Sequence, residues 1–149
     1  MSAALSGSSN HALPTVSLAA DVRSTRRLLF VAGSTYLAWW FAVRAILPGS
    51  YNPIAGRLIV VGFFFFALLG SYARGIGSRV AEPTLTFGIG LLTAHYYYLV
   101  HRNGGEMPWA VGAYVVAVAA GACVRSRKAL LGYSIFTMAL ALAVSMLNP

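Results

Sequence analysis

Acidic residues are almost absent from this sequence. Its 149 residues include three acids, Asp21, Glu82 and Glu106, against eleven lysines and arginines. Charged residues make up 9% of the chain, whereas soluble domains carry about 25%. None of the acids falls within a long apolar run, and proton-coupled transporters usually need a carboxylate there. The composition therefore favours a membrane protein and argues against a proton-coupled transporter.

Cysteine and catalytic motifs are equally scarce. Cys123 is the single cysteine, which excludes a disulfide framework and a cysteine-based metal site within one chain. Its expected structural role is that of a small packing residue in a helix. The sequence has no Ser-His-Asp arrangement, no His-Glu-x-x-His motif and no phosphate-cradling glycine loop. We therefore expect no enzyme activity, no metal and no cofactor.

The net charge of +8 could indicate nucleic-acid binding, but its distribution indicates otherwise. The basic residues occur singly or in short clusters between apolar runs, which is how membrane loops are marked. We therefore expect membrane lipid, and no nucleic acid, as a partner.

Five apolar segments dominate the chain, at residues 28–47, 58–73, 84–100, 109–124 and 129–147. A helix needs about 17–25 residues to cross the hydrocarbon core, so the middle three segments are near the lower limit. Isolated strands would leave unpaired backbone groups in lipid. The prediction is an all-α membrane protein, a bundle of about five transmembrane helices over residues 26–149. Residues 1–25, rich in serine and alanine, are predicted to form a disordered cytoplasmic tail.

The basic residues also predict the orientation of the bundle in the plasma membrane. With the N-terminus inside, eight of the eleven fall on the cytoplasmic side and three, Arg44, Arg57 and Arg102, fall outside. Basic residues are enriched in cytoplasmic loops. The eight are Arg23, Arg26, Arg27, Arg74, Arg79, Arg125, Arg127 and Lys128. Five spans then place the C-terminus outside.

His95 is the ionisable residue placed deepest in a predicted span. It shares a helical face with Tyr98 and Arg102, and Trp109 begins the next segment at the same outer level. A histidine within a span is uncommon and usually faces the bundle interior. One interpretation is a hydrogen-bonding group in a ligand pocket with Tyr98 and Trp109 as walls. The other, somewhat favoured, is a packing histidine bonded to a neighbouring hydroxyl.

Aromatic residues of the first segment form a second candidate wall. Tyr36 and Trp40 are one turn apart and share a face with Arg44. They suit a lipid-like ligand with one polar head. An interfacial aromatic belt with a snorkelling arginine explains them equally well.

Small residues recur at four-residue spacing in the fourth segment, at Ala113, Ala117 and Gly121. This spacing lets helix backbones approach closely. We expect packing within the bundle rather than across a homodimer. The run from Phe63 to Phe66 covers the whole circumference of its helix and is expected to face mostly lipid.

Short motifs follow one another along residues 28–147: PGSYNPIAGR from Pro48 to Arg57, PTLTFGIG from Pro83 to Gly90, HYYY from His95 to Tyr98, Asn103, Trp109, and VRSRKAL from Val124 to Leu130. Their order and spacing resemble the membrane sensor of quorum-sensing receptor histidine kinases that detect long-chain α-hydroxyketones. Similar six-helix modules precede some bacterial nucleotide cyclases.

The resemblance implies a receptor that binds a small lipophilic signal and biases a cytoplasmic histidine kinase. It implies ligand contacts in the third to fifth helices, for which the candidates are His95, Tyr98, Trp109, Cys123 and Tyr133. His95 departs from the family pattern, which has an apolar residue or proline before the aromatic triplet. The sequence shows no sixth apolar segment, phosphoacceptor region or ATP-binding domain, so kinase activity does not carry over. A fragment, a split receptor and a stand-alone sensor remain open.

Three functions therefore compete. A sensor module of a two-component signal-transduction system, with a kinase partner, is favoured. A stand-alone structural or interaction protein comes second, and a small transporter third.

Overall fold

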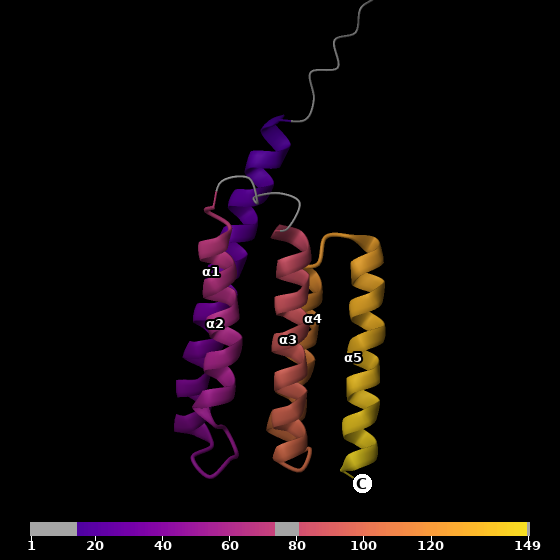
Figure 1. The fold of residues 1–149 in the computed structure, drawn as a ribbon. Coiled ribbons are helices and arrows are strands. Elements are labelled where there is room, and N and C mark those ends of the chain that lie inside the picture. The colour runs from indigo at the N-terminus through magenta and orange to yellow at the C-terminus, as the bar shows by residue number, and fades with distance from the viewer. Residues whose placement is uncertain (1–14, 74–80, 149) are drawn as a thin grey trace, which may run out of the picture.

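The computed structural model describes residues 15–73 and 81–148, which form five helices and no strand. Figure 1 shows them running alternately up and down. The helices are α1 (Thr15–Ile46), α2 (Ile54–Gly70), α3 (Ala81–Arg102), α4 (Met107–Ala122) and α5 (Arg127–Leu147). The prediction of an all-α chain with five helices is confirmed.

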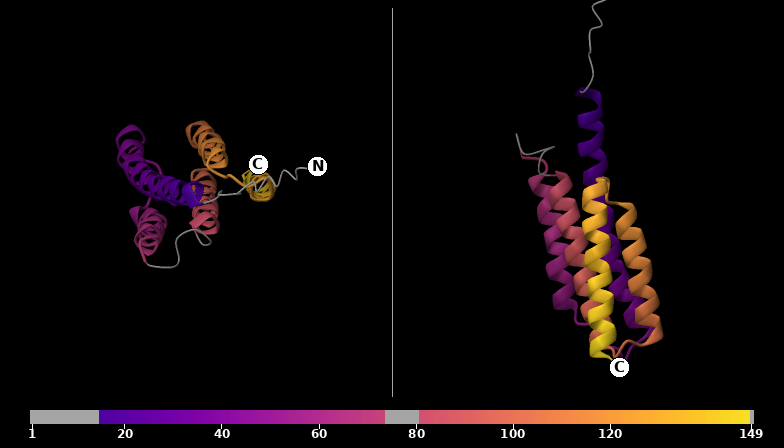
Figure 2. Two further views of the ribbon diagram at one scale, coloured as in Figure 1. Left: turned by 90° about the horizontal axis from the view of Figure 1, so that it is seen from above. Right: turned by 90° about the vertical axis from the view of Figure 1, so that its right-hand side faces the viewer.

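Helix α3 lies at the centre of the bundle and contacts all four others. Helices α1 and α2 form a hairpin on one side of α3, and α4 and α5 lie on the other, as the view from above shows (Figure 2). Over the described residues, the backbones of α1 and α4 make no close contact. This open side of the bundle matters for the site described below.

The core lies where α1, α2 and α3 meet. Leu29, Phe64 and Leu99 are fully buried there. Gly88 of α3 lets α2 approach, since a Cβ at this position would lie 2.8 Å from the Phe63 ring. The expectation that the phenylalanine run faces mostly lipid was wrong for Phe64, because α1 and α3 both cover that side of α2. Phe66, in contrast, is largely exposed.

Helix boundaries differ from the prediction mainly at N-termini. Helix α1 begins at Thr15, so the predicted tail of residues 1–25 overlaps the first turns of a helix. No proline interrupts the chain between Thr15 and Pro48, which allows the helix to extend. Residues 1–14 lie outside the described part. Pro53 caps α2, and Pro83 and Pro108 occupy first turns. A proline is tolerated there because the first turn has no partner for its missing N–H.

Two helical stretches are long and apolar enough to cross a membrane, Val22–Ile46 of α1 and Arg127–Leu147 of α5. Helices α2 and α4 are apolar but shorter, with 17 and 16 residues. At about 1.5 Å per residue they reach roughly 25 Å, somewhat less than a typical hydrocarbon core of about 30 Å.

The two ends of the bundle differ in charge. At the end where α2 and α4 finish, which we call the basic end, lie Arg26, Arg27, Arg125, Arg127 and Lys128. Arg26 donates to the hydroxyl and carbonyl of Ser71 and stacks over Tyr72. Glu106, the one acid whose side chain the structure describes, lies at the opposite end. We call that end the loop end, after the connection at residues 47–53.

Candidate ligand site

A cleft of about 530 Å³ runs between α1, α3 and α4. It opens where α1 and α4 are not in contact. Helix α1 contributes Leu28, Val31, Ala32, Thr35, Tyr36 and Trp39, and α3 contributes Leu85, Ile89 and Leu92. Helix α4 contributes Pro108, Val111, Gly112, Val115, Val116, Ala119 and Ala120, and its C-cap residue Cys123 also lines the cleft. The volume falls within the roughly 300–1,000 Å³ typical of small-molecule sites.

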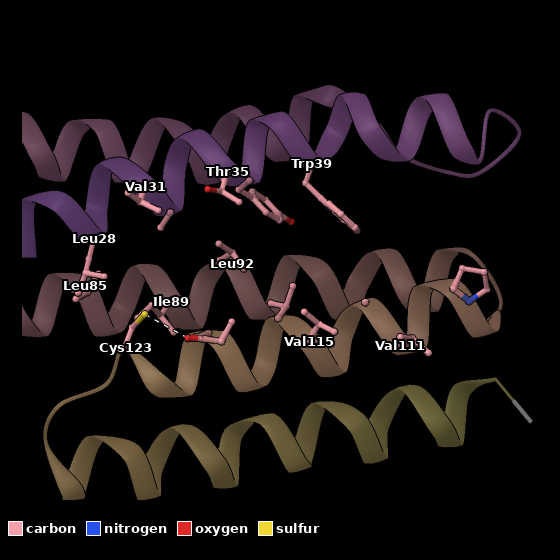
Figure 3. A pocket seen from close by; sticks show the side chains of 17 residues that line it. Leu28, Val31, Thr35, Trp39, Leu85, Ile89, Leu92, Val111, Val115 and Cys123 are labelled. Atoms are coloured by element: carbon pink, nitrogen blue, oxygen red, sulfur yellow. Dashed lines mark hydrogen bonds between the residues drawn. The ribbon is translucent and has the colours of Figure 1, made fainter.

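The character of the cleft changes along its length (Figure 3). Towards the basic end, Leu28 and Leu85 face Cys123, whose thiol donates to the Ala119 carbonyl at 3.4 Å. The Thr35 hydroxyl comes midway, and the Trp39 indole lies nearer the loop end. The cleft therefore suits a long apolar molecule whose polar part lies towards the loop end.

Tyr36 forms one wall of the cleft and also belongs to a buried polar cluster behind that wall. Its hydroxyl lies 2.6 Å from Nδ1 of His95. Its ring lies beneath the Arg57 guanidinium, at 4.7 Å from carbon to ring centroid. We call Tyr36, Asn52, Arg57 and His95 the polar cluster. It joins α1, the loop before α2, α2 itself and α3.

Arg57 is the most unexpected member of this cluster. It was predicted to lie in the outer loop, but it belongs to the first turn of α2 and is 0% exposed. Its Nε donates to Asn52 Oδ1 at 2.9 Å, and its Nη1 donates to the Tyr36 carbonyl at 3.3 Å. Among the described residues, Nη2 has no hydrogen-bond partner and no acid pairs with the guanidinium. A buried charge without a partner is costly.

Two other nitrogens of the cluster also lack partners within the described part of the chain, Asn52 Nδ2 and His95 Nε2. Asn52 Oδ1 accepts from Arg57, which fixes Nδ2 as a donor. Gly56 packs so tightly on His95 that an added Cβ would overlap Nε2. The cluster is therefore rich in donors and poor in acceptors.

The structure does not bring the seven predicted ligand-binding residues together at one site. Tyr36 and Cys123 line the cleft. His95 belongs to the polar cluster and does not line the cleft, because Tyr36 stands between them. Tyr98 is 46% exposed, and its hydroxyl lies 3.2 Å from that of Tyr51, near the loop end.

The remaining candidates pack elsewhere. Trp109 is 1% exposed and lies against Tyr96, with ring centroids 5.9 Å apart. Trp40 donates from Nε1 to the Asn52 carbonyl at 3.0 Å and so holds the loop at residues 47–53. The neighbouring Trp39, which the sequence did not single out, lines the cleft instead. Successive side chains of a helix point about 100° apart, so Trp39 and Trp40 face different neighbours.

The last candidate, Tyr133, connects α3, α4 and α5. Its hydroxyl lies 2.9 Å from Thr93 Oγ1 and donates to the Ala117 carbonyl at 3.2 Å. Its ring would lie 3.5 Å from a Cβ on Gly121. Ala117 and Gly121 of the small-residue stripe therefore lie next to Tyr133, and Ala113 of the same stripe is buried. The stripe packs within the bundle.

Neither protein-family models, nor curated proteins, nor solved structures gave a match to this chain.

Proposed function

We propose that this protein is a sensor module of the plasma membrane that binds a small lipophilic molecule between α1, α3 and α4. The observation that carries the proposal is the cleft of about 530 Å³, which is lined almost entirely by apolar side chains. A site of this kind selects ligands by burial of apolar surface, with a few polar groups fixing orientation.

A membrane location is supported by the exposed surface of α5. Of this helix only Tyr133 is buried, whereas large apolar side chains along it are exposed. They include Leu131, Ile135, Met138, Leu142 and Met146. Soluble proteins rarely expose so continuous an apolar surface. In the proposed sensor, all five helices cross the bilayer and the basic end lies in the cytoplasm.

Helix α1 is the element best placed to transmit a signal. It lines the cleft and, with 32 residues, is the longest of the described helices. It extends past the other helices at the basic end (Figure 1). A ligand between α1 and α4 would set the spacing of these two helices, whose backbones are not in close contact over the described residues. A cytoplasmic kinase-type partner would respond to that spacing.

The transporter alternative is weaker, even though the polar cluster supplies buried polar groups within the bundle. Proton or ion relays in membranes usually contain acids. The polar cluster has a single charged member, Arg57, and no acid among the described residues. The other alternative, a stand-alone structural or interaction protein, does not account for the open cleft between α1, α3 and α4.

Photolabelling of the purified protein in phosphatidylcholine nanodiscs tests the proposal. The probe is a long-chain methyl ester with a diazirine on its chain, and labelled positions are mapped by mass spectrometry. Ala119→Trp places a large side chain in the cleft. Val118→Trp makes the matched change at the adjacent, exposed position outside the cleft.

Saturable labelling of α1 and α4 residues of the cleft is expected in the wild type and in Val118→Trp, and its loss is expected in Ala119→Trp. Labelling that is unsaturable, or equal in all three proteins, would show that the cleft binds no such ligand.

A further inference from the structure

The charge of Arg57 is the feature of this fold that packing does not explain. The guanidinium is fully buried, and the groups of the described residues that contact it are the Asn52 amide oxygen, the Tyr36 carbonyl and the Tyr36 ring. Ionisable residues inside membrane bundles usually pair with one another or with backbone carbonyls, and they often mark a substrate or ion pathway. Arg57 has one such carbonyl, that of Tyr36, but no acid within the described residues balances its charge.

The unpartnered nitrogens around Arg57 show which kind of group would complete the polar cluster. Arg57 Nη2 and Asn52 Nδ2 are donors with nothing to accept from them among the described residues. When the Tyr36 hydroxyl donates to His95 Nδ1, the proton of the neutral imidazole lies on Nε2, which becomes a third donor. Carboxylates and phosphates are acceptors only, and they pair with guanidinium groups in fork geometry. The cluster thus lacks acceptors, and an anion would supply them together with a countercharge for Arg57.

Tyr36 is the connection between this cluster and the cleft. It is 4% exposed, it lines the cleft with one side, and it contacts Arg57 and His95 with the other. One aromatic ring therefore separates the cleft from the uncompensated charge. Rotation of that ring would join the two, at a position along α1 between Thr35 and the loop end.

We propose that the ligand of the cleft is a lipophilic anion, with an apolar chain between α1 and α4 and a carboxylate or phosphate head that pairs with Arg57. This inference rests on the proposed function, since it assigns the ligand class of the same cleft. The head group displaces the Tyr36 ring from beneath the guanidinium, which gives ligand binding a direct effect on α1.

The test compares two diazirine probes of equal chain length in phosphatidylcholine nanodiscs, a long-chain carboxylic acid and its methyl ester. The readout is the ratio of their apparent affinities for the cleft. The wild type should prefer the acid by about tenfold or more, as expected for a desolvated charge pair. In Arg57→Gln the ratio should fall towards one. Arg57→Lys keeps the charge and should keep a preference for the acid.

Arg44→Gln is the matched control, since it removes an exposed arginine near the same end of α1 and should leave the ratio unchanged. Added phosphatidylglycerol distinguishes the source of the anion. Loss of acid labelling identifies a bilayer phospholipid as the occupant, and retention identifies a free lipophilic acid; either result keeps Arg57 as the counter-charge.

Three results separate the hypotheses. A wild-type ratio near one, with saturable ester labelling that Ala119→Trp abolishes, overturns the anionic ligand and leaves the proposed function intact. A high ratio that persists in folded Arg57→Gln shows that another group holds the acid and also overturns the inference. Absence of saturable labelling by either probe overturns the proposed function itself.

Discussion

The hydrogen bond between Tyr36 and His95 allows a quantitative test of the polar cluster. Tyr36→Phe removes one oxygen and leaves the ring in place beneath Arg57, so the cation–π contact at 4.7 Å is retained. What is lost is a contact of 2.6 Å between buried Tyr36 and half-buried His95. The substitution therefore isolates one interaction.

The expected loss of unfolding free energy in Tyr36→Phe depends on whether His95 Nδ1 finds another hydrogen-bond partner. A hydrogen bond between groups that can both return to water contributes about 0.5–1.5 kcal/mol, but an abandoned buried partner costs about 1–3 kcal/mol. Among the described residues, His95 Nδ1 has no other hydrogen-bond partner, and Nε2 of the same ring has none at all. We therefore expect Tyr36→Phe to lower the free energy of unfolding by about 1–3 kcal/mol.

The measurement is unfolding by titration with sodium dodecyl sulfate in mixed micelles, followed by circular dichroism. Tyr98→Phe is the matched control, because it removes the same atom from an exposed tyrosine whose hydroxyl contact is 3.2 Å long. The control should change the unfolding free energy by less than about 0.5 kcal/mol. A double-mutant cycle with His95→Phe should give a coupling energy of about 0.5–3 kcal/mol. Equal effects of the two tyrosine substitutions, or a coupling near zero, would refute the reasoning.

Three further predictions concern packing and topology. Gly112→Ala should destabilise the bundle by about 1–3 kcal/mol in the same titration, because the added Cβ overlaps the hydroxyl of buried Tyr96, whereas Gly62→Ala, with open space around it, should not destabilise it. Gly121→Leu should lower the free energy of unfolding, because the new side chain extends towards the Tyr133 ring, whereas Gly132→Leu should leave it unchanged. If Gly121→Leu also leaves it unchanged, the small-residue stripe faces lipid. A reporter active only in the cytoplasm should work when fused before Arg23 and fail after Pro149, and the opposite pattern would invert the proposed orientation.

The helices could be predicted from the sequence because their signals are local. Each of the five apolar segments overlaps one observed helix. The boundaries were less predictable. The predicted third and fourth segments begin one residue after Pro83 and Pro108, whereas both prolines lie inside first turns, where the helix does not need the N–H that proline lacks.

The sequence placed candidate walls on the first and third predicted helices and at the start of the fourth, and a cleft lies between α1, α3 and α4. That this cleft binds a ligand stays a prediction, and most of its lining was not predictable. The rotation of each helix was not predictable, because it depends on which neighbours cover it. For this reason Trp39 faces the cleft in place of Trp40, and His95 lies behind Tyr36. The burial of Arg57 requires α1 and the preceding loop to cover the start of α2, which no local pattern reveals.

The polar cluster lowers the stability of the ligand-free protein. Removing a charge from water costs several kcal/mol unless a partner repays it, and total stabilities of proteins are only about 5–15 kcal/mol. The apolar residues around Leu29, Phe64 and Leu99 must therefore supply the stability that Arg57 reduces. A ligand that binds the folded protein adds to its stability, and one that also supplies the missing acceptors adds most. Since Tyr36 must move for that ligand to reach Arg57, the same event that relieves the buried charge repositions a side chain of α1. In the proposed receptor, ligand binding and stability would then be coupled through Tyr36.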